Sequence, residues 1–307
     1  MDVEETLKLR LQRTISMGDS SLTGNGSSTT VQGTTSIAVR TMVRSAGLWL
    51  LFGLWSWHYT RYLIFSDTSI VAKVPPYQRT AAGDVILDFT LNDKVSDPPI
   101  IPSELLKWTG CYLPFFITLC YAYLSSRRSQ KAICWLEVLT VVASFSMAIG
   151  LSEGATNFLK IWVQRRRPSF YDLCGFNIQT LKCEASPDYI KEANLSFPSG
   201  HSSLSCCGMT FVVWYFQGKI KTRERWITWA MAVVPWGWSV FVAASRLVDH
   251  WHHPSDIVAG LGLGFAAGTL AYHVWYPPIW SPSAGTPRPI LDEFDSSGNQ
   301  KFGSFND

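Results

Sequence analysis

Six apolar segments separated by polar loops constrain this chain more than any other feature of its sequence. Most of them reach 17 to 21 residues, which is enough for a helix to cross the hydrocarbon core of a bilayer with some tilt. The fourth is the weakest, because Ser, Cys and Gly dilute its first half. We therefore expect an all-α polytopic membrane protein with six transmembrane helices, formed by Ala46–Phe65, Trp108–Leu124, Ala132–Ser152, Ser202–Gln217, Trp226–Ala244 and Ile257–Tyr276.

The composition agrees with a membrane protein. Only 16% of the residues are charged, against about a quarter in an ordinary soluble domain, and Trp, of which there are 14, favours membrane–water interfaces. A net charge of +3 without a basic stripe gives no indication of nucleic-acid binding. We expect one membrane domain over residues 45–278. Disordered cytosolic tails are predicted at 1–44 and 279–307, since residues 16–36 are rich in Ser, Thr and Gly and show no periodicity.

The charges of the short loops predict the orientation. Residues 125–131 carry three basic side chains and no acid, and residues 218–225 carry four basic side chains against one Glu. The positive-inside bias therefore places both termini and these two loops in the cytosol. The other loops would then face the lumen of an organelle or the cell exterior. The sequence does not indicate which organelle holds this integral membrane protein, nor its oligomeric state.

A polar stretch, residues 245–256, joins the last two apolar segments. Charged groups placed between two membrane-length segments are costly, so they indicate a functional site. Pro254 suits the first turn of the next helix, which puts Asp256 in position to hydrogen-bond one imidazole nitrogen of His252 and leave the other free to attack. Arg246 offers a planar fork of donors to a phosphate. A cluster of snorkelling interfacial side chains is the alternative interpretation.

A second group of basic residues ends the third apolar segment. Lys160 and Arg167 are two helical turns apart, so on a helix they would share a face with the polar residues Glu153, Asn157 and Gln164. Pro168 disfavours helix at Arg167, which predicts that the polar stripe ends at the membrane surface. We interpret Arg165 and Arg166 as interfacial anchors.

The third group is Phe197-Pro198-Ser199-Gly200-His201, which opens the fourth apolar segment. Ser199 can cap a helix, and Gly200 lets an anion approach the free N–H groups of its first turn. His201 beside them can deliver a proton to a departing oxygen. A plain helix cap without a ligand is the alternative.

Together the three groups resemble the signature of the type 2 phosphatidate phosphatase (lipid phosphate phosphatase) superfamily, and most resemble the fungal diacylglycerol pyrophosphate/phosphatidate phosphatases. The matching pieces are Lys160-x6-Arg167-Pro168, Pro198-Ser199-Gly200-His201 and Ser245-Arg246-x5-His252-x3-Asp256. The resemblance covers roughly residues 45–276. It leaves Asp249, His250 and His253 outside the pattern, as supporting or surface groups.

The resemblance implies a metal-independent phosphatase of phosphatidate, diacylglycerol pyrophosphate and related lipid phosphates, acting through a phosphohistidine. It implies that His252 attacks phosphorus, Asp256 orients His252, and His201 protonates the leaving oxygen. The phosphate oxygens would be held by Lys160, Arg167, Ser199, Gly200 and Arg246. We expect no metal and no cofactor, because three fixed cations stand where other phosphoryl-transfer sites use Mg²⁺.

Three further features carry expectations. Cys174 and Cys183 share an exterior loop, where an oxidising compartment favours a disulfide between them. Asn194 opens a glycosylation sequon close to the membrane. The four-residue spacing of Gly260, Gly264 and Gly268 predicts close approach of a neighbouring helix.

Other functions remain open on the sequence alone. A lipid headgroup or phosphoryl transferase would use the same residues, and so would a polyprenyl diphosphate phosphatase. A vanadate-dependent haloperoxidase shares this type of pocket, but six membrane spans argue against it. A non-catalytic scaffold would be expected to lack a nucleophile or a phosphate ligand, and none is missing here.

Overall fold

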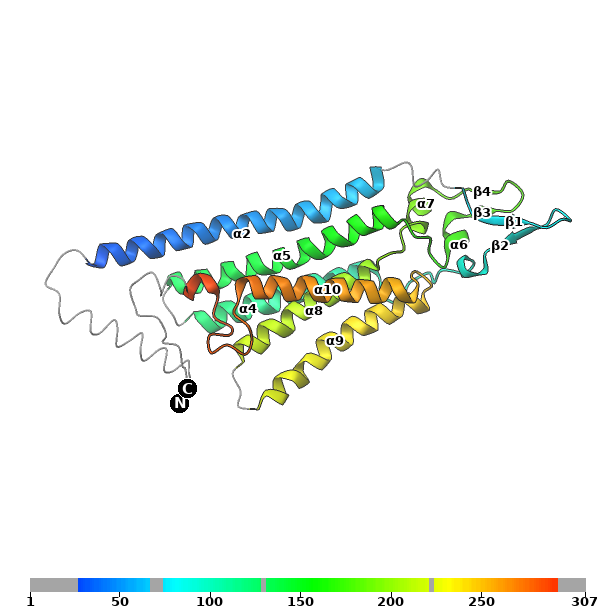
Figure 1. The fold of residues 1–307 in the computed structure, drawn as a ribbon. Helices are drawn as coiled ribbons and strands as arrows, with labels where there is room; N and C mark the ends of the chain where they lie inside the picture. The colour runs from blue at the N-terminus through cyan, green and yellow to red at the C-terminus, as the bar shows by residue number, and fades with distance from the viewer. Residues whose placement is uncertain (1–26, 67–73, 128–130, 221–223, 292–307) are drawn as a thin grey trace, which may run out of the picture.

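The structure, a computed structural model, describes residues 27–66, 74–127, 131–220 and 224–291. Long helices run side by side as a bundle, and short helices and strands gather at one end of it (Figure 1). The chain is mostly helical, as predicted. The long helices are α2 (Ser27–Ser66), α4 (Leu113–Ser126), α5 (Lys131–Val163), α8 (Gly200–Lys219), α9 (Arg225–Val248) and α10 (Pro254–Trp275).

Each predicted apolar segment falls within one of these helical stretches. The second is a continuous run in which α3 (Ser103–Lys107) passes through the π-helical turn η2 (Trp108–Tyr112) into α4. Within the described residues, three helices are long and apolar enough to cross a membrane: Ile133–Val163, Trp226–Val248 and Pro254–Trp275.

Both predicted disordered tails are partly ordered in the structure. Helix α2 begins at Ser27, well before the apolar segment, and Met42 and Ala46 are buried in a cluster with residues of α5. At the other end, Ile290 is buried in the same cluster, so residues 279–291 pack on the bundle. The prediction therefore does not hold for residues 27–44 and 279–291, because tertiary contacts, which composition does not reveal, bury side chains in both segments. Residues 1–26 and 292–307 lie outside the described residues.

Helix α5 is the centre of the bundle and packs against α2, α4, α8 and α10. Its inner face is buried and joins a core rich in aromatic rings, where Phe145 stacks edge-on against Phe211 of α8. Such edge-to-face pairs add about 0.5–1.5 kcal/mol beyond the area they bury. The core therefore fixes α5 and α8, the two helices whose ends carry the first two motifs.

The predicted close packing at the glycines of α10 is confirmed, and the neighbour is α8. A methyl group built on Gly264 would overlap the Ser203 carbonyl oxygen, and one on Gly260 would lie 2.6 Å from the Ser199 carbonyl oxygen. The backbones of α8 and α10 are thus in direct contact. This contact sets the start of α8 beside the start of α10, where Ser199 N donates to Asp256 O at 3.0 Å.

Short elements cover the end of the bundle where α5 finishes and α8 begins. Two antiparallel ribbons, β1 (Tyr77–Arg79) with β2 (Val85–Leu87) and β3 (Phe176–Asn177) with β4 (Lys182–Cys183), lie there. The 3-10 turn η1 (Phe89–Leu91) and helices α6 (Phe170–Cys174) and α7 (Pro187–Ala193) accompany them. Their apolar side chains form a separate small core, against which Trp251 packs. This small core supports the loop that carries His252.

Candidate active site

The three motifs meet at one cavity of about 290 Å³ between the ends of α5, α8 and α9. Six of the eight residues predicted to act on the phosphate line it: Lys160, Arg167, Gly200, His201, Arg246 and His252. The other two, Ser199 and Asp256, are fully buried next to it. Segments that are far apart in sequence thus bring a nucleophile candidate and three cations to one place.

Arg167 reaches the cavity by a different route from the one predicted. Helix α5 ends at Val163, and Gln164 takes a left-handed conformation with φ of 46°. The predicted helical face shared by Lys160, Gln164 and Arg167 is therefore wrong. Lys160 remains on α5, whereas Arg167 is delivered by the extended segment before Pro168.

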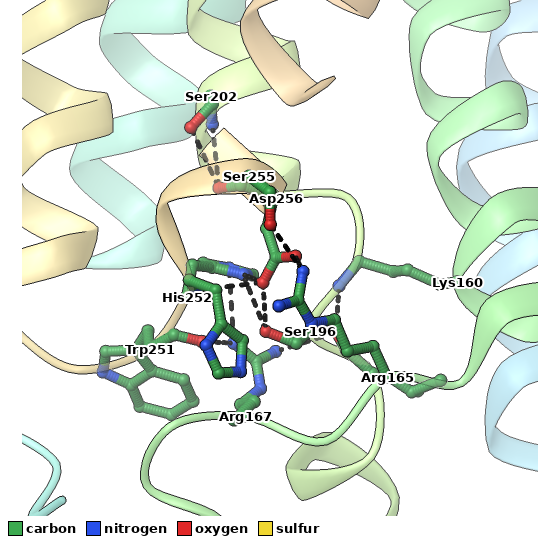
Figure 2. Close-up of polar contacts among 12 residues, drawn as sticks. Lys160, Arg165, Arg167, Ser196, Ser202, Trp251, His252, Ser255 and Asp256 are labelled. Carbon is green, nitrogen blue, oxygen red and sulfur yellow. Dashed lines mark hydrogen bonds and ion pairs between the residues drawn. The ribbon is translucent and has the colours of Figure 1, made fainter. Parts of the chain in front are cut away.

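The Arg167 guanidinium is held on several sides. Its Nη2 donates to Glu192 Oε2 at 2.7 Å, its Nη1 donates to Trp251 O at 2.8 Å, and its Cζ lies 4.9 Å from the centre of the Trp251 ring. The same Nη1 lies 3.3 Å from His252 Nε2 (Figure 2). Its Nε also donates to Glu192 O at 2.6 Å and its Nη2 to Leu195 O at 3.3 Å. The donor that can turn to a phosphate bound to His252 is therefore the Nη1–H that faces the imidazole.

Lys160 lies beside this arginine, because both side chains donate to the same carbonyl oxygen, Leu195 O. It is the basic residue in the last turn of α5, and its Nζ donates to Leu195 O at 2.6 Å. An ammonium carries three donors. With one of them bound to a carbonyl, Lys160 can offer others to phosphate oxygens.

His252 and Asp256 lie at the start of α10, as predicted. Pro254 is the first residue of the helix, and Asp256 closes a capping box with the backbone of His253. The expected direct contact between them is longer than a hydrogen bond, because His252 Nδ1 and Asp256 Oδ2 are 3.7 Å apart. Ser196 Oγ donates to the same carboxylate oxygen at 2.5 Å. The two side chains predicted to act as nucleophile and orienting acid are therefore joined through Ser196.

The electrostatics of His252 suit a nucleophile. Its side chain is almost completely buried, and burial together with the nearby Arg167 cation holds the pKa of His252 well below its usual range. The imidazole is therefore neutral, with a lone pair available, over the physiological pH range.

The start of α8 forms the floor of the cavity. Ser199 caps the helix, as predicted, and accepts a hydrogen bond from Ser202 N at 3.4 Å. Gly200 and His201 line the cavity, and His201 Nε2 is buried with no hydrogen-bond partner within the described part of the chain. An unpartnered ring nitrogen at a helix N-terminus is suited to contact an anion or a departing oxygen.

Two residues near the motifs were misjudged or missed. Arg165 was interpreted as an interfacial anchor, but its Nη1 donates to Asp256 Oδ1 at 2.7 Å and to Ser255 Oγ at 2.6 Å. That interpretation was wrong because α5 ends before Arg165, and the turn at Gln164 redirects the chain toward α10. Ser196 was missed altogether. The only sequence signal for Arg165 was its place in a non-cytosolic loop, where the positive-inside bias predicts few basic residues.

The remaining predicted site residues do not line the cavity. Cys174 and Cys183 are joined by a disulfide with their Cα atoms 5.1 Å apart. Asn194 is buried, with its Nδ2 donating to Ile190 O at 2.9 Å. A glycan on Asn194 would require an exposed side chain, so its burial contradicts the prediction of a glycosylation site there. The sequon pattern is local and carries no information about burial.

Comparisons with known proteins agree with this geometry. The PAP2 superfamily matches residues 141–280, a range that holds all three motifs. The chain is 27% identical to Lipid phosphate phosphatase 2 of Arabidopsis thaliana, over 84% of this chain and 89% of that protein. It is 26% identical to Diacylglycerol pyrophosphate phosphatase 1 of Saccharomyces cerevisiae, over 67% of this chain and 76% of that protein.

A further relative is Phospholipid phosphatase 2 of Mus musculus, which is 31% identical over 43% of this chain and 52% of that protein. No solved structure matches the chain. The matched range, the lipid phosphatase relatives and the cavity that joins the three motifs agree: the chain is a hydrolase similar to the lipid phosphatases of the PAP2 superfamily, with helices apolar enough for a membrane protein.

Proposed function

We propose that this protein hydrolyses phosphatidate, diacylglycerol pyrophosphate or both without a metal ion, through a phosphohistidine on His252. The observation that carries the proposal is the position of His252 Nε2, buried in the cavity 3.3 Å from Arg167 Nη1. Lys160 and Arg246 line the same cavity. A phosphate bound among these cations would present its phosphorus to the free imidazole nitrogen.

The first chemical step transfers the phosphoryl group. The lone pair of His252 Nε2 forms a bond to phosphorus while the bond from phosphorus to the lipid oxygen breaks. The departing oxygen keeps the electrons of the broken bond and takes a proton from His201. The negative charge of the bound phosphate stabilises the protonated form of His201, which the nearby cations would otherwise disfavour. The lipid product leaves, and His252 carries the phosphoryl group with a positive charge on its ring.

The second step returns the enzyme to its starting state. Water attacks phosphorus, the N–P bond breaks, and the electron pair returns to His252 Nε2. One proton of the water passes to His201, which is then ready for the next cycle, and inorganic phosphate leaves. Lys160, Arg167 and Arg246 balance the charge of the phosphoryl group in both steps, which is the work of Mg²⁺ in many other phosphoryl-transfer sites.

The walls of the cavity favour a lipid substrate. Beside the cations, the lining includes Trp57 and Ile64 of α2, Leu106 of α3 and Leu204 of α8. These side chains can accept the apolar portion of a substrate whose phosphate lies at the other wall. The relatives named for lipid phosphate and diacylglycerol pyrophosphate phosphatases support the same class.

We propose six membrane spans, formed by α2, the run from α3 to α4, α5, α8, α9 and α10. The cavity is lined by residues at the ends of α5 and α9 and at the start of α8. The helix termini that border the two basic segments (125–131 and 218–225), the end of α4, the start of α5, the end of α8 and the start of α9, lie at the opposite end of the bundle (Figure 1). By the positive-inside bias those loops and both termini are cytosolic, which places phosphate release in the lumen or outside the cell.

The experiment that tests this function compares two histidine variants on two lipids. Phosphatidate expels an alkoxide, which needs a proton, whereas diacylglycerol pyrophosphate expels a phosphate whose second pKa is about 6. We expect His201→Ala to lower phosphatidate hydrolysis by roughly 10²–10⁴ and the pyrophosphate reaction far less. His252→Ala should abolish both, together with the acid-labile phosphoenzyme trapped by rapid quenching.

Equal losses on both lipids for His201→Ala would limit His201 to holding the phosphate. A phosphoenzyme that survives His252→Ala would move the nucleophile to another residue. Transfer of label from the lipid to a second lipid, rather than to inorganic phosphate, would instead identify a transferase.

A further inference from the structure

The hydroxyl of Ser196 contacts both the imidazole of His252 and the carboxylate of Asp256 (Figure 2). The direct separation of 3.7 Å between His252 Nδ1 and Asp256 Oδ2 is too long for a hydrogen bond. We propose that Ser196 is a positioning residue that relays the orienting effect of Asp256 to His252 and so fixes which ring nitrogen attacks. This inference rests on the proposed function, because it takes His252 as the nucleophile.

The two distances from the hydroxyl determine the direction of the relay. Ser196 Oγ is 2.5 Å from Asp256 Oδ2 and 3.5 Å from His252 Nδ1. A serine hydroxyl has one proton, and the shorter contact has the length of an O–H donor bound to a carboxylate. The proton of Ser196 therefore points to Asp256, and its lone pairs face the ring. Only a protonated Nδ1 is attracted to a lone pair, so Nε2 is left without a proton and can accept the Nη1–H of Arg167 at 3.3 Å.

The carboxylate is held where it is by two further donors. Asp256 Oδ2 also accepts a hydrogen bond from His253 N at 3.0 Å, and Oδ1 accepts one from Arg165 Nη1 at 2.7 Å. Asp256 is completely buried, so water does not offer replacements. Moving the carboxylate toward His252 would lengthen these contacts, each of which is charge-assisted or made by a backbone N–H.

The hydroxyl is held as firmly as the carboxylate. Ser196 is completely buried, and its backbone N donates to Arg165 O at 2.8 Å. The same residue, Arg165, thus contacts Asp256 through its side chain and Ser196 through its backbone. The segment 165–167 therefore has two roles: it carries Arg167 to the cavity, and through Arg165 it holds Asp256 and Ser196 in place beside His252.

The relay has a definite chemical consequence. When His252 Nε2 bonds to phosphorus, the ring becomes positive and keeps its proton on Nδ1. The Ser196 oxygen accepts that N–H, and its own O–H remains on the Asp256 carboxylate, so the new charge is stabilised without moving a proton. Without the hydroxyl, only the Arg167 N–H that faces Nε2 at 3.3 Å opposes protonation of Nε2, and the tautomer protonated there cannot attack.

The test is a double-mutant cycle on the full-length enzyme in detergent or lipid nanodiscs. We expect Ser196→Ala to lower kcat on phosphatidate by roughly 10- to 100-fold, with KM almost unchanged. In an Asp256→Asn background the same change should have little further effect, because both residues act through one path. Ser169→Ala is the matched control: Ser169 is also fully buried, but its Oγ donates to His250 O at 2.9 Å.

A spectroscopic readout separates positioning from packing. Side-chain ¹⁵N spectra of histidine-labelled protein, with His252→Asn to assign the signal, report which ring nitrogen carries the proton. We expect Nδ1–H in the wild type and in Ser196→Thr, which keeps the hydroxyl, and a mixture of tautomers in Ser196→Ala. If Ser196→Ala does not yield folded protein, Ser196→Cys provides the weak-donor variant for the same spectra.

Two results would overturn the relay. The first is a tautomer and a kcat that do not change in Ser196→Ala. The second is an equal loss of kcat from Ser196→Ala in the wild-type and Asp256→Asn backgrounds, which would show that Ser196 has a purely structural role. The tautomer measurement needs no turnover, so it is independent of the proposed reaction. If no phosphoenzyme can be trapped in the wild type while the tautomers behave as expected, the proposed function is wrong. The proposed effect of Ser196 on the tautomer of His252 would still stand.

Discussion

Arg246 Nη2 donates to Asp249 Oδ2 at 2.7 Å, and both side chains are buried at the end of α9. The same carboxylate oxygen accepts a hydrogen bond from Ile100 N at 3.0 Å, and Asp249 O accepts one from Ser96 N at 3.4 Å. Asp249 therefore holds the guanidinium that we propose to bind the phosphate, and it also attaches the segment before α3 to the end of α9. It does so from the C-cap of α9, three positions after the arginine.

This pair predicts the effect of removing one charge. In Asp249→Asn the Arg246 guanidinium loses its ionic partner, and a buried charge left unpaired is strongly destabilising, at about 3–5 kcal/mol for complete removal of a partner. We expect kcat/KM on phosphatidate to fall at least roughly tenfold and the unfolding temperature to fall as well. Asp188→Asn, an exposed acid in the first turn of α7, is the control. Wild-type kcat/KM in Asp249→Asn would show that Arg246 orients itself.

The pH profile follows from the lowered pKa of His252. Burial and the Arg167 cation disfavour the charged imidazole, so the neutral nucleophile persists as pH falls and is lost only when pH passes below its depressed pKa. The acid limb of kcat/KM should therefore lie below about pH 6.5, the ordinary value for histidine. In Arg167→Gln the acid limb of the residual activity should lie at higher pH, because the Arg167 cation that helps to lower the pKa of His252 is gone. An acid limb at or above pH 6.5 in the wild type would contradict this.

Metal removal should leave the enzyme active. Lys160, Arg167 and Arg246 provide the positive charge of the cavity, so turnover is expected to continue in excess EDTA. Vanadate, which can adopt the five-coordinate geometry of the phosphorus in transfer, should inhibit competitively with the lipid. Activity that is lost in EDTA and recovered with Mg²⁺ would mean that the three cations are insufficient. The measurement is phosphate release at matched lipid and detergent concentrations.

The contact between α8 and α10 predicts different outcomes for two neighbouring glycines. In Gly264→Ala the new methyl group would overlap the Ser203 carbonyl oxygen, so the helices must separate, at a cost of about 1–3 kcal/mol. Gly262→Ala adds the same group where nothing lies within 4 Å. We expect Gly264→Ala to lose activity more than expression, because a shift of 1 Å near the site can cost about 10²-fold. Equal activity and expression in the two variants would reject the packing role.

Local patterns were enough for several features. The six apolar segments all lie in helices, Ser199 caps α8, and Pro254 starts α10. Hydrophobic stretches, cap residues and proline act within a few residues of their own position, so they can be read without knowing the fold. The residue types of the three motifs likewise indicate phosphate chemistry from the sequence alone.

Contacts between distant segments were outside the reach of these patterns. The sequence predicted that Arg167 would extend a helical face and that Arg165 would anchor at the membrane surface. The left-handed Gln164 instead ends the helix and turns Arg165 onto Asp256, 91 positions away in sequence. The order in α2 before Ala46 and in residues 279–291 has the same origin, because Met42 and Ile290 are buried in one cluster with side chains of α5.

The sequence by itself determined that this is a membrane chain with a phosphate-directed set of histidine, lysine and arginine side chains. It did so because burial in a bilayer and the charge of a phosphate restrict which residue types can be used. Only the tertiary structure decided how His252 is oriented. Ser196 and Asp256 are separated by 60 residues, and a hydrogen bond between them depends on the packing of α8 against α10, which leaves no periodic trace in the sequence.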